Sequence, residues 1–409
     1  MQPIIVFEDS GVNNLTPLVY WRTVFELRCG RRTLLDRVAH FLKVPVAGLW
    51  TRDVWAAVAT ERLQVPANAR LQPDTLLING RWLFDRQVDF HAPPYVGTHG
   101  DHIAYIACDA PLADRLTPAD LLDPKRSADL IRSVAHGPVD ARMIDYAWDL
   151  VSYNAEALQA DWTGDRAFEG KVSSSAHLLE PDLIHVGDRA VVGPTAVIDA
   201  QEGPVYIAEG ARIGPHTYIA GPTYIGPGAV IKPHTHIHGG TTIGPLCKVG
   251  GEVYACIIAG YSNKQHAGFL GQAYVASWVN LGAGTVNSNL KNTYGSIRVP
   301  VNGRDVDTGL TFFGSIIGDH AKLGIQQALP TGASIGCAAM VASSRILPKF
   351  VPSFSWLADD GSEEGDPERL LATARLVMRR REVICSDAEA QLFITAARIA
   401  REWETAAPA

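Results

Sequence analysis

The sequence predicts an N-terminal α/β domain, then a parallel β-helix with short helices at its end, and a six-residue repeat carries most of this prediction. Between 207 and 249 an aliphatic residue occupies every sixth position, and the spacing returns between 317 and 347. A period of six fits neither an α-helix nor an ordinary strand pair, whereas it is typical of solenoids whose short strands end at corners. The repeated residues are Ile207, Ile213, Ile219, Ile225, Ile231, Ile237, Ile243, Val249, Ile317, Leu323, Leu329, Ile335, Val341 and Leu347.

Glycine and proline follow several repeated residues, as in Ile213-Gly214-Pro215 and Ile243-Gly244-Pro245. Both residue types suit a tight corner, since glycine adopts unusual φ values and proline fixes φ. The repeat stops between 250 and 316, and we expect this interruption to project loops, where functional side chains concentrate. The β-helix is therefore expected over 166–352.

The flanking regions carry other patterns. Residues 1–140 alternate short apolar runs, such as Ile4–Phe7 and Ile103–Cys108, with segments of helical spacing, which predicts an α/β domain. A helical connector is expected over 141–165. A helical tail is expected over 353–409, because residues 366–404, rich in Ala, Arg, Leu and Glu, suggest two helices that cap or pack on the open end of the solenoid.

Composition narrows the functional classes. The 409-residue chain has a net charge of −7 and no dense run of Lys or Arg, which argues against nucleic-acid and anionic-membrane partners. No apolar stretch approaches the ~20 residues of a membrane span, and Met1–Phe7 is too short for a signal peptide. The six cysteines are scattered without a C-x-x-C pair, as in proteins kept reduced, so a cytoplasmic protein is expected.

The chemistry-bearing motifs lie in the interruption. It reads N-K-Q-H-A-G-F-L-G over 263–271 and V-N-L-G-A-G-T-V-N-S-N over 279–289. This pattern resembles the acetyltransferase half of the bifunctional enzymes that make UDP-N-acetylglucosamine, which carry H-x-x-Y-x-G, then V-N-I-G-A-G-T and a later Asn. The resemblance implies a left-handed β-helix and a homotrimer. It further implies acetyl transfer from acetyl-CoA to an amino-sugar phosphate, with glucosamine 1-phosphate as the expected acceptor.

By this resemblance, His266 is the general base, and Asn280 and Asn289 position the reacting groups. Acetyl transfer needs such a base, because only an unprotonated amine attacks a thioester, and imidazole titrates near neutral pH. An amide or backbone N–H would stabilise the oxyanion of the tetrahedral intermediate. In the alternative interpretation, His266 is a surface residue and both asparagines are left-handed corner residues, a conformation that Asn tolerates.

The resemblance also places acetyl-CoA in a groove between neighbouring coils. Ala283, Ile325 and Ser343 would line this groove, and Gly282 would let the ligand approach the main chain closely.

The motif departs from the family at two points. Phe269 stands where the family has Tyr, which removes a hydroxyl group, and the family's later Lys is out of register. Lys291 and Arg298 are the nearest cations and are candidates to bind the substrate phosphate, although both could equally be solvated charges.

The N-terminal region resembles an alternative bacterial version of the same bifunctional enzymes. Residues 15–30 read L-T-P-L-V-Y-W-R-T-V-F-E-L-R-C-G, close to that group's L-x-P-L-x-x-x-R-P-x-x-E-L-R-x-G. The usual glycine-rich loop, L-A-A-G-x-G-T-R-M, is absent. The resemblance implies a nucleotidyltransferase-like domain. If it transfers a uridylyl group from UTP, Arg22 and Arg28 are the candidates to bind phosphate and Asn79 the candidate to contact base or ribose. In the alternative interpretation both arginines are structural and the domain is a degenerate scaffold.

A weaker similarity concerns metal binding in this domain. Asp109, in C-D-A-P-L, is similar to the Mg²⁺ ligand of sugar nucleotidyltransferases, although it follows a different segment at too short a distance.

Two other functional classes stay open. One is a sugar-nucleotide-binding or regulatory trimeric scaffold with degenerate sites, which the missing glycine-rich loop and Phe269 favour. The other is a β-helix zinc hydratase, for which His234, His236 and His238 are the candidate ligands. Their spacing of two differs from the H-x4-H pair of those enzymes, so surface histidines are the preferred interpretation.

Overall fold

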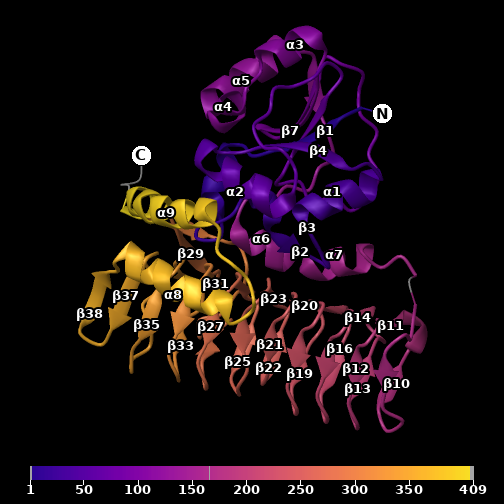
Figure 1. Ribbon diagram of the computed structural model, residues 1–409, viewed down its shortest axis with the longest axis vertical. Coiled ribbons are helices and arrows are strands. Elements are labelled where there is room, and N and C mark those ends of the chain that lie inside the picture. Colours follow the sequence, from indigo (N-terminus) through magenta and orange to yellow (C-terminus); the bar gives the residue numbers. More distant parts are fainter. Residues whose placement is uncertain (1, 165, 406–409) are drawn as a thin grey trace.

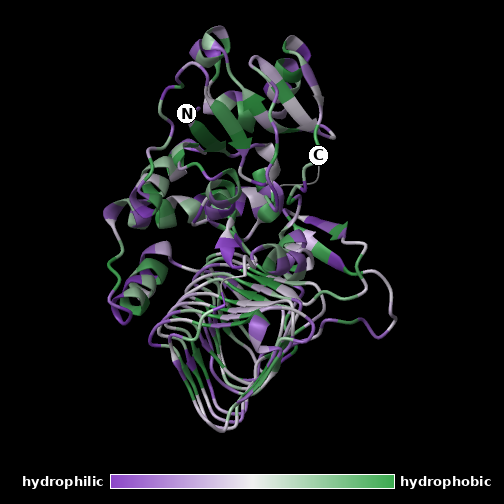
Figure 2. Ribbon diagram, turned by 90° about the vertical axis from the view of Figure 1, so that its right-hand side faces the viewer, coloured by the Kyte–Doolittle hydropathy of each residue, from purple (hydrophilic) through white to green (hydrophobic). Residues whose placement is uncertain are grey.

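The chain folds into an α/β domain that lies along one side of a left-handed parallel β-helix (Figure 1). The structure, a computed structural model, describes residues 2–164 and 166–405. Strands of successive coils pair in parallel and form the three faces of a prism, whose triangular cross-section is visible in Figure 2. The chain passes from face 1 to face 2 to face 3 in each coil, and each corner is named here by the two faces it joins, as in corner 3/1.

The strands of each face are as follows. Face 1 contains β10 (His177–Leu179), β13 (Val197–Asp199), β16 (Tyr218–Ala220), β19 (His236–Ile237), β22 (Glu252–Tyr254) and β25 (Phe269–Gly271), continued by the pair β28 (Val286–Asn287) and β33 (Ala328–Leu329). Face 2 contains β11 (Ile184–Val186), β14 (Val205–Ile207), β17 (Thr223–Ile225), β20 (Thr241–Ile243), β23 (Ile257–Ile258), β26 (Tyr274–Val275), β31 (Ser315–Ile317), β34 (Ala333–Ile335) and β36 (Phe350–Val351). Face 3 contains β9 (Lys171–Val172), β12 (Val191–Val192), β15 (Arg212–Ile213), β18 (Val230–Ile231), β21 (Lys248–Val249), β24 (Asn263–Lys264), β27 (Asn280–Leu281), β32 (Lys322–Leu323), β35 (Met340–Ala342), β37 (Ser355–Ala358) and β38 (Gly361–Glu364).

The N-terminal domain is built on one mixed sheet with the strand order β4-β1-β5-β7-β6-β8. Its strands are β1 (Ile4–Phe7), β4 (Val46–Trp50), β5 (Leu76–Asn79), β6 (Tyr95–His99), β7 (His102–Ala107) and β8 (His136–Pro138). Its helices are α1 (Leu34–Leu42), α2 (Asp53–Leu63), α3 (Ala110–Arg115), α4 (Pro118–Leu122) and α5 (Pro124–Ser133), and β2 (Arg28–Cys29) and β3 (Arg32–Thr33) form a hairpin. Short 3-10 helices occupy Ser10–Leu15, Val24–Glu26 and, in the first coil of the β-helix, Pro181–Leu183.

The predicted repeat is confirmed. The repeated residues from Ile207 to Val249 point into the prism and are at most 3% exposed. The reason for the corner glycines differs from the expected one, because the φ of Gly244 is not in the left-handed region. A Cβ on Gly244 would lie 1.7 Å from the carbonyl oxygen of Ala259 in the next coil, so close stacking of the coils requires glycine there.

The expectation that residues 250–316 leave the solenoid as loops is wrong for most of this segment. The coils continue through it, because shorter corners keep Val253, Ile258 and Leu270 facing inward although the six-residue spacing is lost. Two inward positions carry polar residues, Lys264 and Asn287, which hide the repeat further. The projecting part is the hairpin of β29 (Arg298–Val301) and β30 (Arg304–Asp307), whose turn at 302–303 has positive φ at both residues.

The α/β domain and its connector cover face 2. The connector helices α6 (Ala147–Ser152) and α7 (Asn154–Ala160) lie over this face (Figure 1). The Asn154 side chain donates to Gly240 O at 2.7 Å, the Thr242 hydroxyl donates to Gly30 O at 3.0 Å, and Arg28 N donates to the Tyr274 hydroxyl at 3.1 Å. Face 2 is therefore an internal surface, whereas faces 1 and 3 present outward side chains to the surroundings.

The C-terminal helices α8 (Pro367–Arg379) and α9 (Asp387–Thr405) do not cap the open end, contrary to expectation. They lie along corner 2/3 and reach the α/β domain, while the hairpin β37–β38 ends the solenoid (Figure 1). The apolar face of α9 explains this placement, because the Phe393 ring packs edge-on against Trp21 of the α/β domain and Phe354 of the β-helix. Among the described helices, none combines the length and apolar character that crossing a membrane requires.

A buried ion pair joins the two domains beside α9. The Arg22 guanidinium pairs with the Asp319 carboxylate through both oxygens, and the Asp319 side chain is fully buried. Next to it, His320 is 1% exposed and lies edge-on to Trp21 at 4.5 Å. Burial lowers the pKa of His320 well below its usual range, so this ring is neutral in the junction.

We expect Asp319→Asn to lower the free energy of unfolding by about 3 kcal/mol, because it leaves the Arg22 guanidinium buried without its counter-charge. Urea denaturation measures the loss. The matched control is Asp114→Asn, which removes the exposed pair with Arg70 and is expected to cost less than about 1 kcal/mol. Equal losses in the two variants would contradict a structural role for the interdomain pair.

Candidate functional site

Four of the predicted site segments form one column along corner 3/1. Gly284 N donates to Ala267 O at 3.1 Å, and Gln326 N donates to Ala283 O at 2.7 Å in the next coil. The Gln327 side chain then donates to the carbonyls of Ile325 and Ser343 at 2.8 and 2.7 Å. The fold thus brings His266 and the predicted acetyl-CoA residues together, although they are far apart in the sequence.

Two side chains of this column, those of His266 and Ile325, are exposed. His266 is exposed at the turn before β25, and Ile325 is 68% exposed, which is high for a large aliphatic side chain. Further along the column, Ser343 donates its hydroxyl to Asp359 at 2.8 Å. Hydrogen bonds from Ser344 and Ser343 lower the pKa of Asp359 to about 2.

The main chain of 282–284 is mostly committed to coil pairing. Gly282 N donates to Leu323 O at 3.0 Å and Gly284 N donates to Ala267 O, so neither N–H is available to a ligand. Within the described structure, Ala283 is the residue of this corner whose N–H has no carbonyl partner. A Cβ on Gly282 would lie 2.2 Å from Gly324 O, so this glycine also permits coil stacking.

Lys264 supports the corner that carries His266, and the sequence interpretation missed it. Its side chain points into the prism and is 3% exposed, and its ammonium donates to the carbonyls of Gly250, His266 and Gly268 at 2.8, 3.1 and 2.7 Å. Burial lowers the pKa of Lys264 to about 8. The repeat gave no signal for it, because the six-residue spacing is lost before 264 and its inward position could not be read from the sequence.

The two predicted asparagines lie on different faces. Asn289 follows β28, and its amide donates to the Gln272 side chain beside Phe269 and Gly271 of face 1. Asn280 is on face 3, paired with Asn263, and is half-buried. One copy of the chain therefore groups His266, Phe269 and Asn289 around face 1 and leaves Asn280 on the other side of the corner.

Cations gather at the base of the β29–β30 hairpin. The Lys291 ammonium donates to Ser296 O at 2.9 Å, and Arg298 is exposed at the start of β29. Lys349, which the sequence interpretation did not single out, lies close to both. Burial, opposed by Asp305 and reinforced by the positive charges of Lys291 and Arg298, lowers the pKa of Lys349.

The α/β domain has its own cleft of about 570 Å³ between the carboxyl end of β1 and α5. Asp9, Ser10, His102, Arg132 and His136 are among the residues that line it. Such strand ends are the usual ligand sites of open α/β sheets, so the residues after Ile4–Phe7 were the signal that could have predicted this cleft.

The Asp9 carboxylate is held in place by hydrogen bonds from Arg81 and Asn79. Arg81 forms two 2.7 Å hydrogen bonds to its carboxylate, and the Asn79 amide donates to it at 2.8 Å. Burial acts to raise the pKa of Asp9, but the Arg81 charge and the hydrogen bonds from Arg81 and Asn79 together outweigh it, so the pKa lies below its usual range. Asn79 is 0% exposed, so it supports the floor of the cleft.

The structure does not bring the other predicted nucleotide-binding residues to this cleft. Arg22 pairs with Asp319 of the β-helix, and Arg28 lies against Tyr274 of face 2. Asp109 caps α3, because its carboxylate accepts a hydrogen bond from Leu112 N at 2.9 Å. It lies near the start of β5, whereas Asn79 is at the opposite end of that strand. These three residues do not serve the cleft, because Arg22 and Arg28 lie in the domain interface and Asp109 caps α3.

The described residues contain no group of three or more His, Cys, Asp or Glu side chains placed to hold a metal ion. His236 and His238 stack on each other at 4.0 Å, and His234 stacks on His216 at 4.9 Å. Neither the Mg²⁺ nor the zinc hypothesis gains a ligand set from this arrangement of the described residues.

Residues 4–165 match the sequence profile of the family described as sugar nucleotidyl transferase. The α/β domain and its connector match that family as one unit. A bifunctional sugar-1-phosphate nucleotidylyltransferase/acetyltransferase of Sulfurisphaera tokodaii is 34% identical over 152 residues, which cover 37% of this chain and 38% of that protein. The bifunctional protein GlmU of Methanococcus vannielii is 28% identical over 106 residues, which cover 26% and 25% of the two chains.

These findings confirm the resemblance to the bifunctional enzymes. The matched segments span only 38% and 25% of the two curated relatives. Among solved structures, a UDP-N-acetylglucosamine acyltransferase of Francisella novicida is 14% identical, with a TM-score of 0.27 over 56% of this chain and 89% of that one. One of Campylobacter jejuni is 16% identical, with a TM-score of 0.24 over 57% and 84%.

We expect Lys264→Met to lower the free energy of unfolding by about 2 kcal/mol, because three carbonyls lose a charged donor while the cost of burying the ammonium is removed. Urea denaturation measures the change. Lys248→Met, on the outward side of the neighbouring coil, is the control and is expected to change stability by less than about 0.5 kcal/mol. An unaltered Lys264→Met protein would show that the corner does not depend on this ammonium.

Proposed function

We propose that this protein transfers the acetyl group of acetyl-CoA to the amine of an amino-sugar phosphate, with glucosamine 1-phosphate as the acceptor. We also propose that the α/β domain transfers a uridylyl group from UTP, so that the two reactions yield UDP-N-acetylglucosamine. The observation that carries the first proposal is the corner 3/1 column, in which His266 is followed, coil by coil, by Ala283, Ile325 and Ser343.

The chemistry follows from the groups in this column. The His266 imidazole accepts a proton from the amine, which then attacks the thioester carbonyl. The N–H of Ala283 is positioned to donate to the oxyanion of the tetrahedral intermediate. The attack forms the C–N bond and the tetrahedral intermediate. Its collapse restores the carbonyl and breaks the C–S bond, and coenzyme A leaves as its thiol after the sulfur takes up the proton held by His266. The exposed Ile325 offers apolar contact to the donor, which lies along the corner.

The acceptor would lie on face 1, beside Phe269 and Asn289. Its phosphate would be bound by the cations Lys291, Arg298 and Lys349 at the base of the hairpin, because a dianion is stabilised by several positive charges on one side. In this proposal Lys349 helps to bind the phosphate, which is the role of the family lysine that is out of register in this sequence.

The site needs a second copy of the chain. Asn280 is on face 3, away from Phe269 and Asn289, so it would complete the site of a neighbouring copy. Face 2 is covered by the α/β domain, which leaves faces 1 and 3 for assembly. A contact of face 1 with face 3 of the next copy is heterologous, and three such contacts can close a ring.

A second function, that of a scaffold with degenerate nucleotide chemistry, is favoured by the α/β cleft. Arg81 occupies both oxygens of Asp9 at the strand end where phosphates or a metal would bind. Calorimetric titration separates the two functions, because the enzyme binds acetyl-CoA and UTP and the scaffold binds neither donor.

We expect His266→Ala to reduce acetyl transfer by about 10²–10⁴-fold, the usual contribution of a general base, while uridylyl transfer is unchanged. Steady-state assays of both half-reactions with glucosamine 1-phosphate measure this. His177→Ala, an exposed histidine of face 1 far from the column, is the matched control and should keep full activity. Retained acetyl transfer in a folded His266→Ala trimer would refute the proposed base.

A shared site predicts complementation between two inactive variants. When His266→Ala and Asn280→Ala chains are co-expressed and purified as mixed oligomers, about one site in three has both native residues, because each mixed cyclic trimer contains one such neighbour pair. Acetyl transfer should therefore recover to roughly a third of the wild-type rate per site, as measured on two-tag-purified protein. A mixture as inactive as each parent would show that both residues act within one chain.

A further inference from the structure

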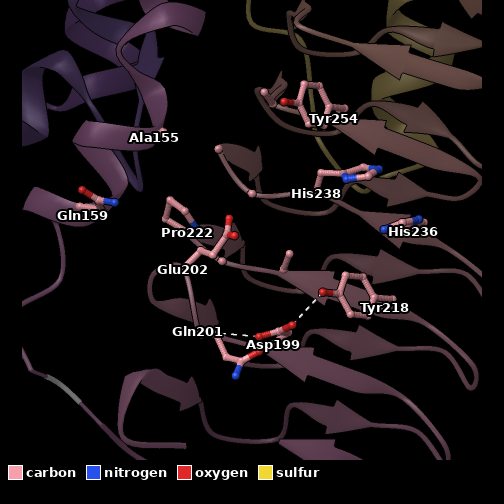
Figure 3. Close-up of a pocket in the computed structure, with 15 residues that line it drawn as sticks. Ala155, Gln159, Asp199, Gln201, Glu202, Tyr218, Pro222, His236, His238 and Tyr254 are labelled. Atoms are coloured by element: carbon pink, nitrogen blue, oxygen red, sulfur yellow. Dashed lines mark hydrogen bonds between the residues drawn. The ribbon is translucent and has the colours of Figure 1, made fainter. Parts of the chain in front are cut away.

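A groove larger than the cleft of the α/β domain is not part of the proposed acetyl-transfer site. It has a volume of about 820 Å³ and lies between α7 and face 1 (Figure 3). Four rings form a continuous row on its face 1 side. Tyr218 lies edge-on to His236 at 5.0 Å, His236 stacks on His238 at 4.0 Å, and His238 lies edge-on to Tyr254 at 5.0 Å.

Carboxylates and amides surround this row of rings. Asp199 accepts from the Tyr218 hydroxyl at 2.8 Å, and Glu252 lies 3.2 Å from Nε2 of His238. In Figure 3, the Glu202 carboxylate points into the space between face 1 and α7, which presents Gln159 from the opposite side. None of the 15 residues that line the groove is Lys or Arg.

This composition discriminates between ligands. A phosphate or nucleotide is disfavoured, because Asp199 and Glu202 repel an anion and no cation of Lys or Arg type offsets them. A metal ion is disfavoured too, since the described residues contain no suitable ligand set. Flat rings beside carboxylates suit a ring-shaped ligand with one apolar face, hydroxyl groups and a positive charge.

We propose that this groove is a second carbohydrate site, which binds an amino sugar without a phosphate group. The apolar face of the sugar packs on the row from Tyr218 to Tyr254, its ammonium is bound by Glu202, and Gln159 of α7 contacts its hydroxyls. The site is one coil from the proposed acceptor position, because Tyr254 pairs with Gly271. It is independent of acetyl transfer, since it uses no residue of the corner 3/1 column.

Binding of glucosamine tests the proposal on the full-length protein. Calorimetry and the ring-proton NMR signals of the histidines are followed during titration with glucosamine, glucose and glucosamine 1-phosphate. Glucosamine is expected to shift the His236 and His238 signals, and glucose, which has no ammonium, to bind at least tenfold more weakly. Glucosamine 1-phosphate is expected to leave these two signals unmoved, although it binds at the proposed acceptor position.

Variants assign the binding to the groove. Glu202→Gln should weaken glucosamine at least tenfold and leave glucose unchanged, and Tyr254→Ala should weaken both sugars. His177→Ala, on the same face outside the groove, is the control. His266→Ala should keep full glucosamine binding in the groove even if acetyl transfer is lost, or was never present, which separates this proposal from the proposed function.

Three outcomes would overturn the proposal. The first is that no sugar shifts the His236 and His238 signals, and the second is that glucosamine 1-phosphate shifts them more than glucosamine does. The third is that Tyr254→Ala dissociates the oligomer, because the row of rings is then an interface between copies of the chain.

Discussion

The close stacking of successive coils is the constraint on which the rest of the structure depends. Neighbouring parallel strands lie about 4.8 Å apart, so a corner side chain meets the backbone of the next coil. Gly244 and Gly282 lie where no side chain fits. A Cβ would lie 1.7 Å from a carbonyl oxygen of the next coil at Gly244 and 2.2 Å from one at Gly282. The same stacking makes neighbours of residues separated by one whole coil. The corner 3/1 column of the candidate site is a direct result, because main-chain hydrogen bonds hold each corner on the one before it.

The inward positions of the repeat explain both the success and the failure of the sequence interpretation. Where these positions are aliphatic, as from Ile207 to Val249, the pattern predicts each coil correctly. Between 250 and 316 the corners shorten and Lys264 and Asn287 replace aliphatic residues, so the pattern disappears although the coils continue. A buried ammonium or amide is tolerated only with hydrogen-bond partners, and here the corner carbonyls supply them. Those partners exist only after folding, so residue type alone could not identify them.

The α/β domain shows the same limit for charged residues. The central strands β1 and β7 and the helical connector were predictable from apolar runs and spacing, but the roles of its arginines were not. Arg22 is partnered by Asp319, 297 residues away, and Arg81 by Asp9, 72 residues away. A guanidinium in a motif can bind a ligand phosphate or neutralise a buried carboxylate, and the two uses look identical in sequence. In the described structure the second use accounts for both arginines, and the cleft is lined by other residues, Arg132 and His102 among them.

The covered face links the two domains to assembly. Because the α/β domain buries face 2, a neighbouring copy can reach the solenoid only through faces 1 and 3. Corner 3/1, which carries His266, is the edge that these two free faces share. In the proposed assembly, a residue on either side of this edge contributes to a site formed between copies, with Phe269 and Asn289 on one face and Asn280 on the other. The groove between α7 and face 1 follows from the same arrangement, since the connector that covers face 2 extends past its corner and overhangs the row of rings.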